Sequence, residues 1–210
     1  MDVNNLLLAT SNPAKQQRLG WLLEGLSLAP VTLDELGLAG REPQEEGATH
    51  EENACLKAEF WSSRRDGLVI SSDGGLVIPV LGDRWASLRT RRFAGGLAGD
   101  EMRVRRLLDL MEPYDGDERR ASWVEAVAIA DRGQILGSWQ VEGATGLLLK
   151  RPGSGPRVPG FWAFSIWYFP ELEKSYNELD EGELEVLNDH WIQLKRLVQT
   201  FFHQRTGTTG

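Results

Sequence analysis

The sequence predicts an α/β fold, because three patterns combine strands with helices. Residues 5–10, with an apolar run at residues 6–9, predict a buried strand, and Ser-Asn-Pro follows as the start of a helix. Apolar residues alternate in residues 121–131 and apolar character continues in residues 134–146, on either side of an Arg-Gly pair, which predicts a long β-hairpin. Apolar residues at helical spacing in residues 183–203 predict a C-terminal helix, followed by a frayed tail over residues 204–210.

Length and composition limit the classes of function. The chain has 210 residues, 41% hydrophobic and 26% charged, so it can bury a core of its own. Its net charge of −8 argues against a broad surface for nucleic acid or anionic lipid, so any phosphate must be bound locally. The longest near-apolar stretch, residues 161–169, is about half the length of a membrane-spanning helix. A single cysteine, Cys55, excludes an internal disulfide. The first residues contain no basic segment and only a short apolar run, so we expect no signal peptide and a cytoplasmic protein.

The first helix is expected from Pro13 to about residue 26, directly after the first strand. Unpaired N–H groups at a helix N-terminus can bind an anion, and Lys15 lies in the first turn. Asn12 and Lys15 are therefore candidate ligand-binding residues. The alternative is an ordinary capped helix without a ligand.

A loop is expected over residues 33–48, and a helix over residues 51–65. Thr49 and Glu52 have the spacing of a capping box, which explains Glu52 without any function. Asn53 and Lys57 stand four residues apart and share one face of this helix. They are therefore the better candidates for a functional pair.

Asp73 lies in the segment Ser-Asp-Gly-Gly between two apolar runs, residues 68–71 and 76–81. We expect a strand in each run and a tight turn at Asp73 between them. An Asp in such a turn commonly bonds its own backbone. A carboxylate at the end of a buried strand, beside glycines that let a ligand approach, also suits a metal site.

A basic loop over residues 84–96 and a helix over residues 100–111 are expected to follow. The four arginines of the loop could offset the acidic field locally, or could be solvated and paired with nearby acids. Most of the eight tryptophans are expected in the core.

Four motifs in this order resemble the inosine triphosphate pyrophosphatase family. They are Thr10-Ser11-Asn12 with Lys15, then Glu45-Glu46-Gly47-Ala48-Thr49 with Glu52-Asn53-Ala54 and Lys57-Ala58, then Ser72-Asp73-Gly74-Gly75-Leu76, and last Thr90-Arg91-Arg92-Phe93-Ala94-Gly95. No motif is specific alone. Their order and spacing closely resemble those of the family over residues 5–96. The resemblance continues more weakly to about residue 195.

The resemblance implies a two-lobed α/β fold, with a long mixed β-sheet flanked by helices and a central substrate cleft, over a single domain of residues 1–210. It implies a homodimer that hydrolyses a nucleoside triphosphate to a monophosphate and pyrophosphate with Mg²⁺. By position, the metal ligands would be Glu45 and Asp73, the catalytic residues Asp73 and Lys15, and the substrate-binding residues Thr10, Ser11, Asn12, Lys15, Asn53, Lys57, Gly74, Arg92, Phe161, Trp162 and His190. Carboxylates and phosphate oxygens suit Mg²⁺, and lysines supply point charges for phosphate.

The chain departs from the family pattern at several positions. Ser72 stands where the family has the first of two adjacent acids, and Arg18 stands where it has an acid in the first helix. The segment Phe161-Trp162-Ala163-Phe164-Ser165 keeps only the Phe of the stretch that closes over the base, without the base-recognising Asp. Of a later Ser-His-Arg motif, only His190 is kept.

These departures predict an altered base preference, with Phe161 and Trp162 stacking on a base. The alternatives are that this aromatic segment fills the pocket as core, and that His190 is packed rather than functional. A catalytically weak nucleotide-binding protein on the same scaffold, and hydrolysis of another phosphoanhydride, also remain open.

Overall fold

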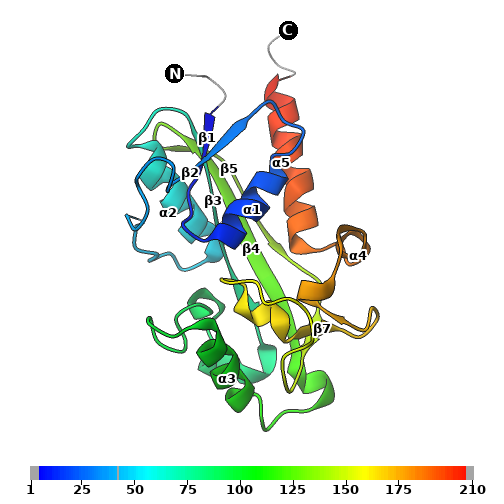
Figure 1. The fold of residues 1–210 in the computed structure, drawn as a ribbon. Helices are drawn as coiled ribbons and strands as arrows, with labels where there is room; N and C mark the ends of the chain where they lie inside the picture. The colour runs from blue at the N-terminus through cyan, green and yellow to red at the C-terminus, as the bar shows by residue number, and fades with distance from the viewer. Residues whose placement is uncertain (1–4, 42, 207–210) are drawn as a thin grey trace. The chain divides into compact units, whose positions relative to one another are not determined.

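The structure is a computed structural model that describes residues 5–41 and 43–206. The chain divides into two compact units (Figure 1). Within the described residues, unit 1 comprises residues up to Asp73 together with 125–141 and 191–206, and unit 2 comprises residues 74–124 and 142–190. None of the described helices is long and apolar enough to cross a membrane.

Eight strands among the described residues confirm the predicted mixed α/β fold. They are β1 (Asn5–Leu8), β2 (Ala29–Thr32), β3 (Leu68–Val77), β4 (Arg120–Asp131), β5 (Gln134–Glu142), β6 (Gly146–Leu148), β7 (Trp167–Phe169) and β8 (Lys174–Ser175). Hydrogen bonds link them in the order β2-β1-β3-β4-β6-β7-β8, and β5 pairs with β4. Strand β1 is parallel to β2 and β3, whereas β6 is antiparallel to β4 and β7, and β7 to β8.

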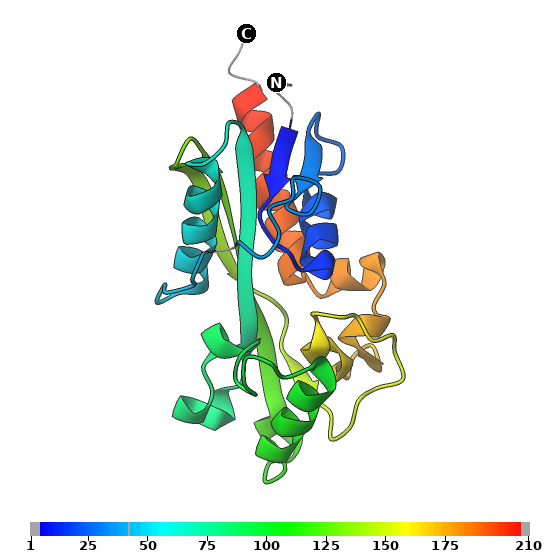
Figure 2. The ribbon, with the colours of Figure 1, turned by 60° about the vertical axis from the view of Figure 1, so that its left-hand side comes forward.

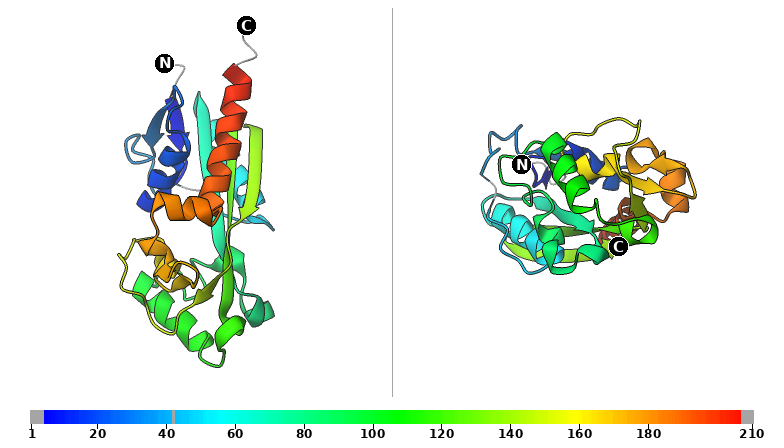
Figure 3. Two further views of the ribbon diagram at one scale, coloured as in Figure 1. Left: turned by 90° about the vertical axis from the view of Figure 1, so that its right-hand side faces the viewer. Right: turned by 90° about the horizontal axis from the view of Figure 1, so that it is seen from below.

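In unit 1, helices cover both faces of the strands. Helix α2 (His50–Ser62) lies on one face, and α1 (Pro13–Leu22) and α5 (His190–Thr206) lie on the other (Figures 2 and 3). Two small residues of α2, Ala54 and Ala58, pack against small residues of β4, namely Ala126, Ala128 and Ala130. Since side chains alternate along a strand, the odd-numbered residues of β4 point to the face of α1 and α5.

Unit 2 has an aromatic core. It contains α3 (Asp100–Leu110), α4 (Glu181–Val186), and the 3-10 helices Pro79–Arg84, Ser87–Arg89, Gly116–Arg119, Trp162–Ser165 and Tyr176–Glu178. Trp167 stacks on Tyr176 with ring centroids 5.0 Å apart, and Trp123 contacts Phe164 at 4.9 Å. Six of the eight tryptophans, all of them in the described part of the chain, are buried, as the sequence predicted.

The predicted turn at Asp73 is wrong. Strand β3 runs without interruption from Leu68 to Val77, so Asp73 lies within a strand, and the apolar run after it ends this strand and enters a 3-10 helix. One of the two glycines that suggested a turn, Gly75, serves close packing instead. A Cβ atom on Gly75 would lie 2.1 Å from the backbone oxygen of Ser87 and 2.8 Å from Oγ1 of Thr90.

Replacing Gly75 with Ala is therefore expected to destabilise the protein by about 1–3 kcal/mol, because a backbone carbonyl cannot move aside as a flexible side chain would. The free energy of unfolding in urea measures this loss. Gly96→Ala is the matched control, since no atom lies within 4 Å of a Cβ added there. Equal stability of the two variants would contradict the close approach at Gly75.

The predicted C-terminal helix of residues 183–203 is broken in two. Helix α4 ends at Val186 and α5 begins at His190, and Asn188 between them has a left-handed backbone with φ of 47°. Helix α5 continues to Thr206, so the predicted frayed tail is wrong for residues 204–206. Residues 207–210 lie outside the described residues.

Other elements differ from the prediction at their ends. Helix α1 stops at Leu22 rather than near residue 26, shortly before Gly25 with φ of 81°. Helix α2 covers residues 50–62 rather than 51–65. The hairpin of β4 and β5 is confirmed, with Arg132 and Gly133 at its turn, but β5 ends at Glu142 and residues 146–148 form β6.

Candidate active site

The junction of β1 and α1 places Lys15 at the N-terminus of a helix. Asn12 is the N-cap, and its Oδ1 accepts a hydrogen bond of 3.0 Å from the backbone N–H of Ala14. The Oγ1 atom of Thr10 accepts one of 3.2 Å from the N–H of Asn12. Pro13 then begins the helix, where its missing N–H costs nothing. Thr10, Ser11 and Asn12 thus form the capping turn that leads to Lys15.

The start of α2 holds the loop that carries Glu45. Thr49 is the N-cap as predicted, and its Oγ1 accepts a hydrogen bond of 3.0 Å from the N–H of Glu52. The carboxylate of Glu52 accepts a hydrogen bond from the N–H of Ala48. Buried Asn53 accepts a hydrogen bond of 2.8 Å from the N–H of Gly47 through its Oδ1. Asn53 therefore holds the loop before α2 in place, which is a structural role. Its contact with a ligand stays a prediction.

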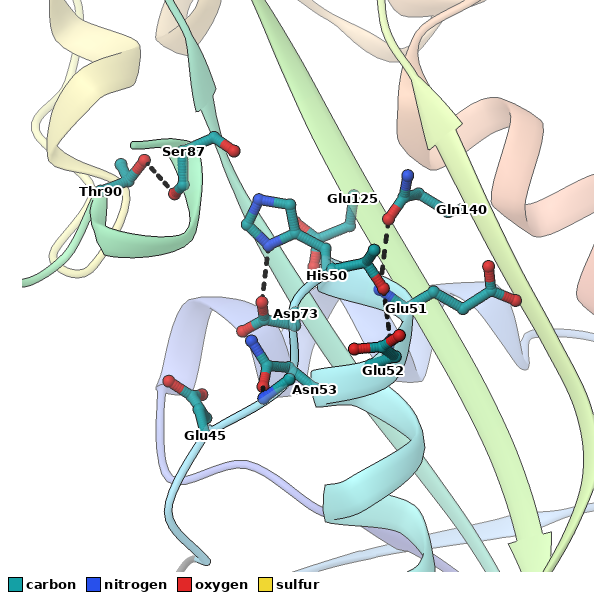
Figure 4. Close-up of polar contacts among 12 residues, drawn as sticks. Glu45, His50, Glu51, Glu52, Asn53, Asp73, Ser87, Thr90, Glu125 and Gln140 are labelled. Carbon is teal, nitrogen blue, oxygen red and sulfur yellow. Dashed lines mark hydrogen bonds and ion pairs between the residues drawn. The ribbon is translucent and has the colours of Figure 1, made fainter. Parts of the chain in front are cut away.

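Asp73 is at the centre of a cluster of charged side chains in unit 1. Its Oδ1 lies 3.1 Å from Nζ of Lys57, and its Oδ2 lies 2.6 Å from Nδ1 of His50. The same Nζ of Lys57 lies 3.0 Å from Oε1 of Glu45. Figure 4 shows His50, at the start of α2, pointing at Asp73. Three predicted site residues, Glu45, Lys57 and Asp73, therefore meet at one ammonium group.

The contacts of the cluster fix the charge states of Asp73 and Lys57. Burial raises the pKa of Asp73, but the hydrogen bond from His50 and the charges of Lys57 and Lys15 outweigh it and hold that pKa far below its usual range. Burial lowers the pKa of Lys57, but the charges of Asp73 and Glu45 outweigh it and raise that pKa. Asp73 is therefore an anion and Lys57 a cation at neutral pH.

Lys15 has an acidic partner of its own, Glu125 of β4. Its Nζ lies 2.9 Å from Oε1 of Glu125, a side chain with no exposed surface. Lys15 also acts on Asp73 through its charge. Both lysines that the sequence singled out thus belong to unit 1 with Asp73, each within 3.1 Å of a carboxylate.

Sequence reasoning left His50 undecided and missed Glu125. Glu125 is the one charged residue between Ala121 and Ala130, in a strand that is otherwise small or apolar. A lone charge in a buried strand is a signal that could have identified it.

The remaining predicted residues, Gly74, Arg92, Phe161, Trp162 and His190, belong to unit 2. Gly74 continues β3 after Asp73, and Arg92 is exposed. His190 has no exposed surface, its Nδ1 lies 2.7 Å from Oδ1 of Asp189, and its ring stacks on Tyr176. His190 is therefore packed, which was the alternative to a contact with a ligand.

Phe161 and Trp162 are both packed and beside a cavity. Trp162 stacks on Phe93 with ring centroids 5.6 Å apart, and Phe161 stacks on Phe164 at 4.8 Å. They also line a cavity of about 790 Å³ within unit 2, together with residues of α3 and of the loop before them. The packing expected of core residues is confirmed, and the predicted stacking of Phe161 and Trp162 on a base stays a prediction.

The donor set of the cluster fits Mg²⁺. Among the described residues, no three acidic, histidine or cysteine side chains come together as a metal site by themselves. Mg²⁺, however, usually takes only one or two carboxylates from a protein and completes its octahedron with water and substrate phosphate. Glu45 and Asp73 are two such carboxylates, and one oxygen of each lies within 3.1 Å of Nζ of Lys57.

Comparisons with known proteins match nearly the whole chain. The sequence profile of the Ham1 family matches residues 6–191. A dITP/XTP pyrophosphatase of Thermoanaerobacter pseudethanolicus is 31% identical over 193 residues, which are 91% of this chain and 93% of the relative. One of Thermus thermophilus is 31% identical over 198 residues, 93% of this chain and 91% of the relative. The structure of a Ham1 protein from Coxiella burnetii has a TM-score of 0.78 at 25% identity, over 95% of this chain and 98% of that one.

Proposed function

This chain belongs to the Ham1 family, and we propose that it hydrolyses a nucleoside triphosphate to the monophosphate and pyrophosphate. Relatives about as long as this chain are named dITP/XTP pyrophosphatases. The observation that carries the proposal is the convergence of Glu45, Asp73 and Lys57 at one point of unit 1. Two carboxylates and a buried ammonium suit a phosphoanhydride and its counterion.

Each side chain of the cluster has a proposed task. Lys15 and the N-terminus of α1 bind oxygens of the phosphate chain, because both carry positive charge. Lys57 neutralises a second group of phosphate oxygens. Asp73 orients the attacking water, with its own orientation fixed by His50 and Lys57.

Glu45 and Asp73 are also the proposed ligands of Mg²⁺. When bound there, Mg²⁺ would supply positive charge that stabilises the negative charge developing on the phosphate chain. We further propose that the base preference differs from that of the relatives, because aromatic faces stack on any base and the base-recognising Asp is absent. Phe161 and Trp162, beside the cavity of unit 2, support this part of the proposal.

The test is pyrophosphate release from dITP, XTP, ITP and the common nucleoside triphosphates, with Mg²⁺ and with a chelator. We expect turnover that requires Mg²⁺, with a ranking of bases that identifies the preferred substrate. A protein that releases no pyrophosphate from any of them would contradict the proposed reaction. Turnover that persists in the chelator would contradict the proposed need for Mg²⁺ but not the proposed reaction.

A second candidate is a nucleotide-binding protein without turnover. It is favoured by one observation: Lys57 already neutralises Glu45 and Asp73, so a metal ion must compete with an ammonium for them. It predicts that a triphosphate raises the melting temperature and is recovered intact. Rapid hydrolysis would exclude it.

A further inference from the structure

Lys15 occupies a position where a cation is disfavoured. It is the third residue of α1, and the first turn of this helix contains no acidic residue. The unpaired N–H groups there carry partial positive charge, which repels an ammonium group. A compensating negative charge must therefore come from outside the helix.

Glu125 supplies that charge from the sheet. Its Oε1 lies 2.9 Å from Nζ of Lys15, and the Glu125 side chain has no exposed surface, whereas that of Lys15 is 14% exposed. A buried carboxylate without a cation is strongly unfavourable, so Glu125 holds the ammonium in place. A strand within a sheet is a more rigid support for such a contact than a loop. Figure 4 shows Glu125 on β4.

The pair lies on one face of the sheet, and an unpartnered hydroxyl shares that face. Ser71 donates to the backbone oxygen of Ala54 in α2, so the next residue, Ser72, points to the opposite face, where α1 lies. Glu125 points to the same face, because Ala126 and Ala128 pack against α2. Oγ of Ser72 is buried, and no group in the described part of the chain bonds it. A buried polar atom without a partner is uncommon in folded proteins.

We propose that Glu125 is a positioning residue, which fixes the ammonium of Lys15 so that its other N–H groups point at the phosphate chain of the substrate. The inference rests on the proposed function, because Lys15 is its phosphate-binding residue. An ammonium has three N–H donors, so one bond to Glu125 leaves two for phosphate oxygens.

The sign of the effect on anion binding separates positioning from two simpler roles. If Glu125 were only a nearby negative charge, removing that charge would tighten the binding of a polyphosphate, because anions repel each other. If the ion pair served stability alone, its removal would leave the binding of a polyphosphate unchanged. Only positioning predicts weaker binding of an anion after an anionic residue is neutralised.

The experiment measures the affinity for inorganic tripolyphosphate by titration calorimetry, without metal, for the whole chain. We expect Glu125→Gln to weaken binding about 10- to 100-fold, by analogy with the loss of a partner that orients a metal-ligating side chain. In a Lys15→Met background, Glu125→Gln should cause no further weakening, because the residue that it positions is absent. Glu51→Gln is the matched control, a partly buried glutamate of unit 1 that accepts a bond from Ser138.

Three results would overturn the proposal: tighter or unchanged binding in Glu125→Gln, equal weakening in the Lys15→Met background, or no binding of tripolyphosphate by the unaltered protein. If Glu125→Gln does not fold, Glu125→Asp decides the same question, since it keeps the charge but shortens the reach to Lys15, and a loss of affinity is expected. Pyrophosphate release is assayed separately. If the protein binds tripolyphosphate as expected but releases no pyrophosphate, the proposed reaction is contradicted, whereas the positioning role of Glu125 is not.

Discussion

Replacing Asp73 with Asn is expected to lower kcat/KM for triphosphate hydrolysis about 100- to 1,000-fold, as the loss of one preorganised charged group commonly does. The amide keeps the shape of the side chain but removes the negative charge that faces Lys57 and His50. It also removes one of the two proposed metal ligands. Steady-state pyrophosphate release, at substrate concentrations on both sides of KM, measures the loss.

The control for this variant is Asp131→Asn, at the end of β4 in the same unit. It carries the same chemical change outside the cluster, and its kcat/KM should equal that of the unaltered protein. A rise in KM alone for Asp73→Asn would show that Asp73 serves ground-state binding only. Unchanged kinetics would contradict its place in the active site.

The sequence identified most of the charged residues that cluster in unit 1, but not all of their contacts. Lys15, Glu45, Lys57 and Asp73 were recognised from motifs in order, and the structure brings them into one unit. Glu125 could not be found in that way, because it lies 110 residues from its partner Lys15. Only the pairing of β3 with β4 and the burial of β4 create the contact.

The errors in secondary structure have physical causes. The glycines after Asp73 favour a turn by local propensity, but Ser87 packs against Gly75 and keeps the strand extended. The periodic C-terminal pattern extends across Asn188, where the backbone turns left-handed, so the pattern could not show the break. Strands β6, β7 and β8 have two or three residues, too few to show a period.

Replacing Lys57 with Met is expected to destabilise the protein by about 3–5 kcal/mol, the cost of removing one partner from a buried ion pair. Lys57 is 9% exposed and Asp73 12%, so water cannot take the place of the ammonium. The side chain of Glu45 is 29% exposed, so water can partly replace the ammonium beside it and its share of the destabilisation is smaller. The free energy of unfolding in urea, without metal, measures the effect.

A double variant tests whether this loss comes from the carboxylate left behind. Lys57→Met with Asp73→Asn removes both charges, so the double variant should be more stable than the sum of the single losses predicts, by about 0.5–3 kcal/mol. Lys150→Met is the control, because Lys150 pairs with Asp115 at the surface, where both side chains are mostly exposed. Strict additivity would mean that Lys57 and Asp73 do not interact in solution. Coupling would show that the charges of Lys57 and Asp73, which we propose to serve a metal and a phosphate chain, also stabilise the fold when neither is bound.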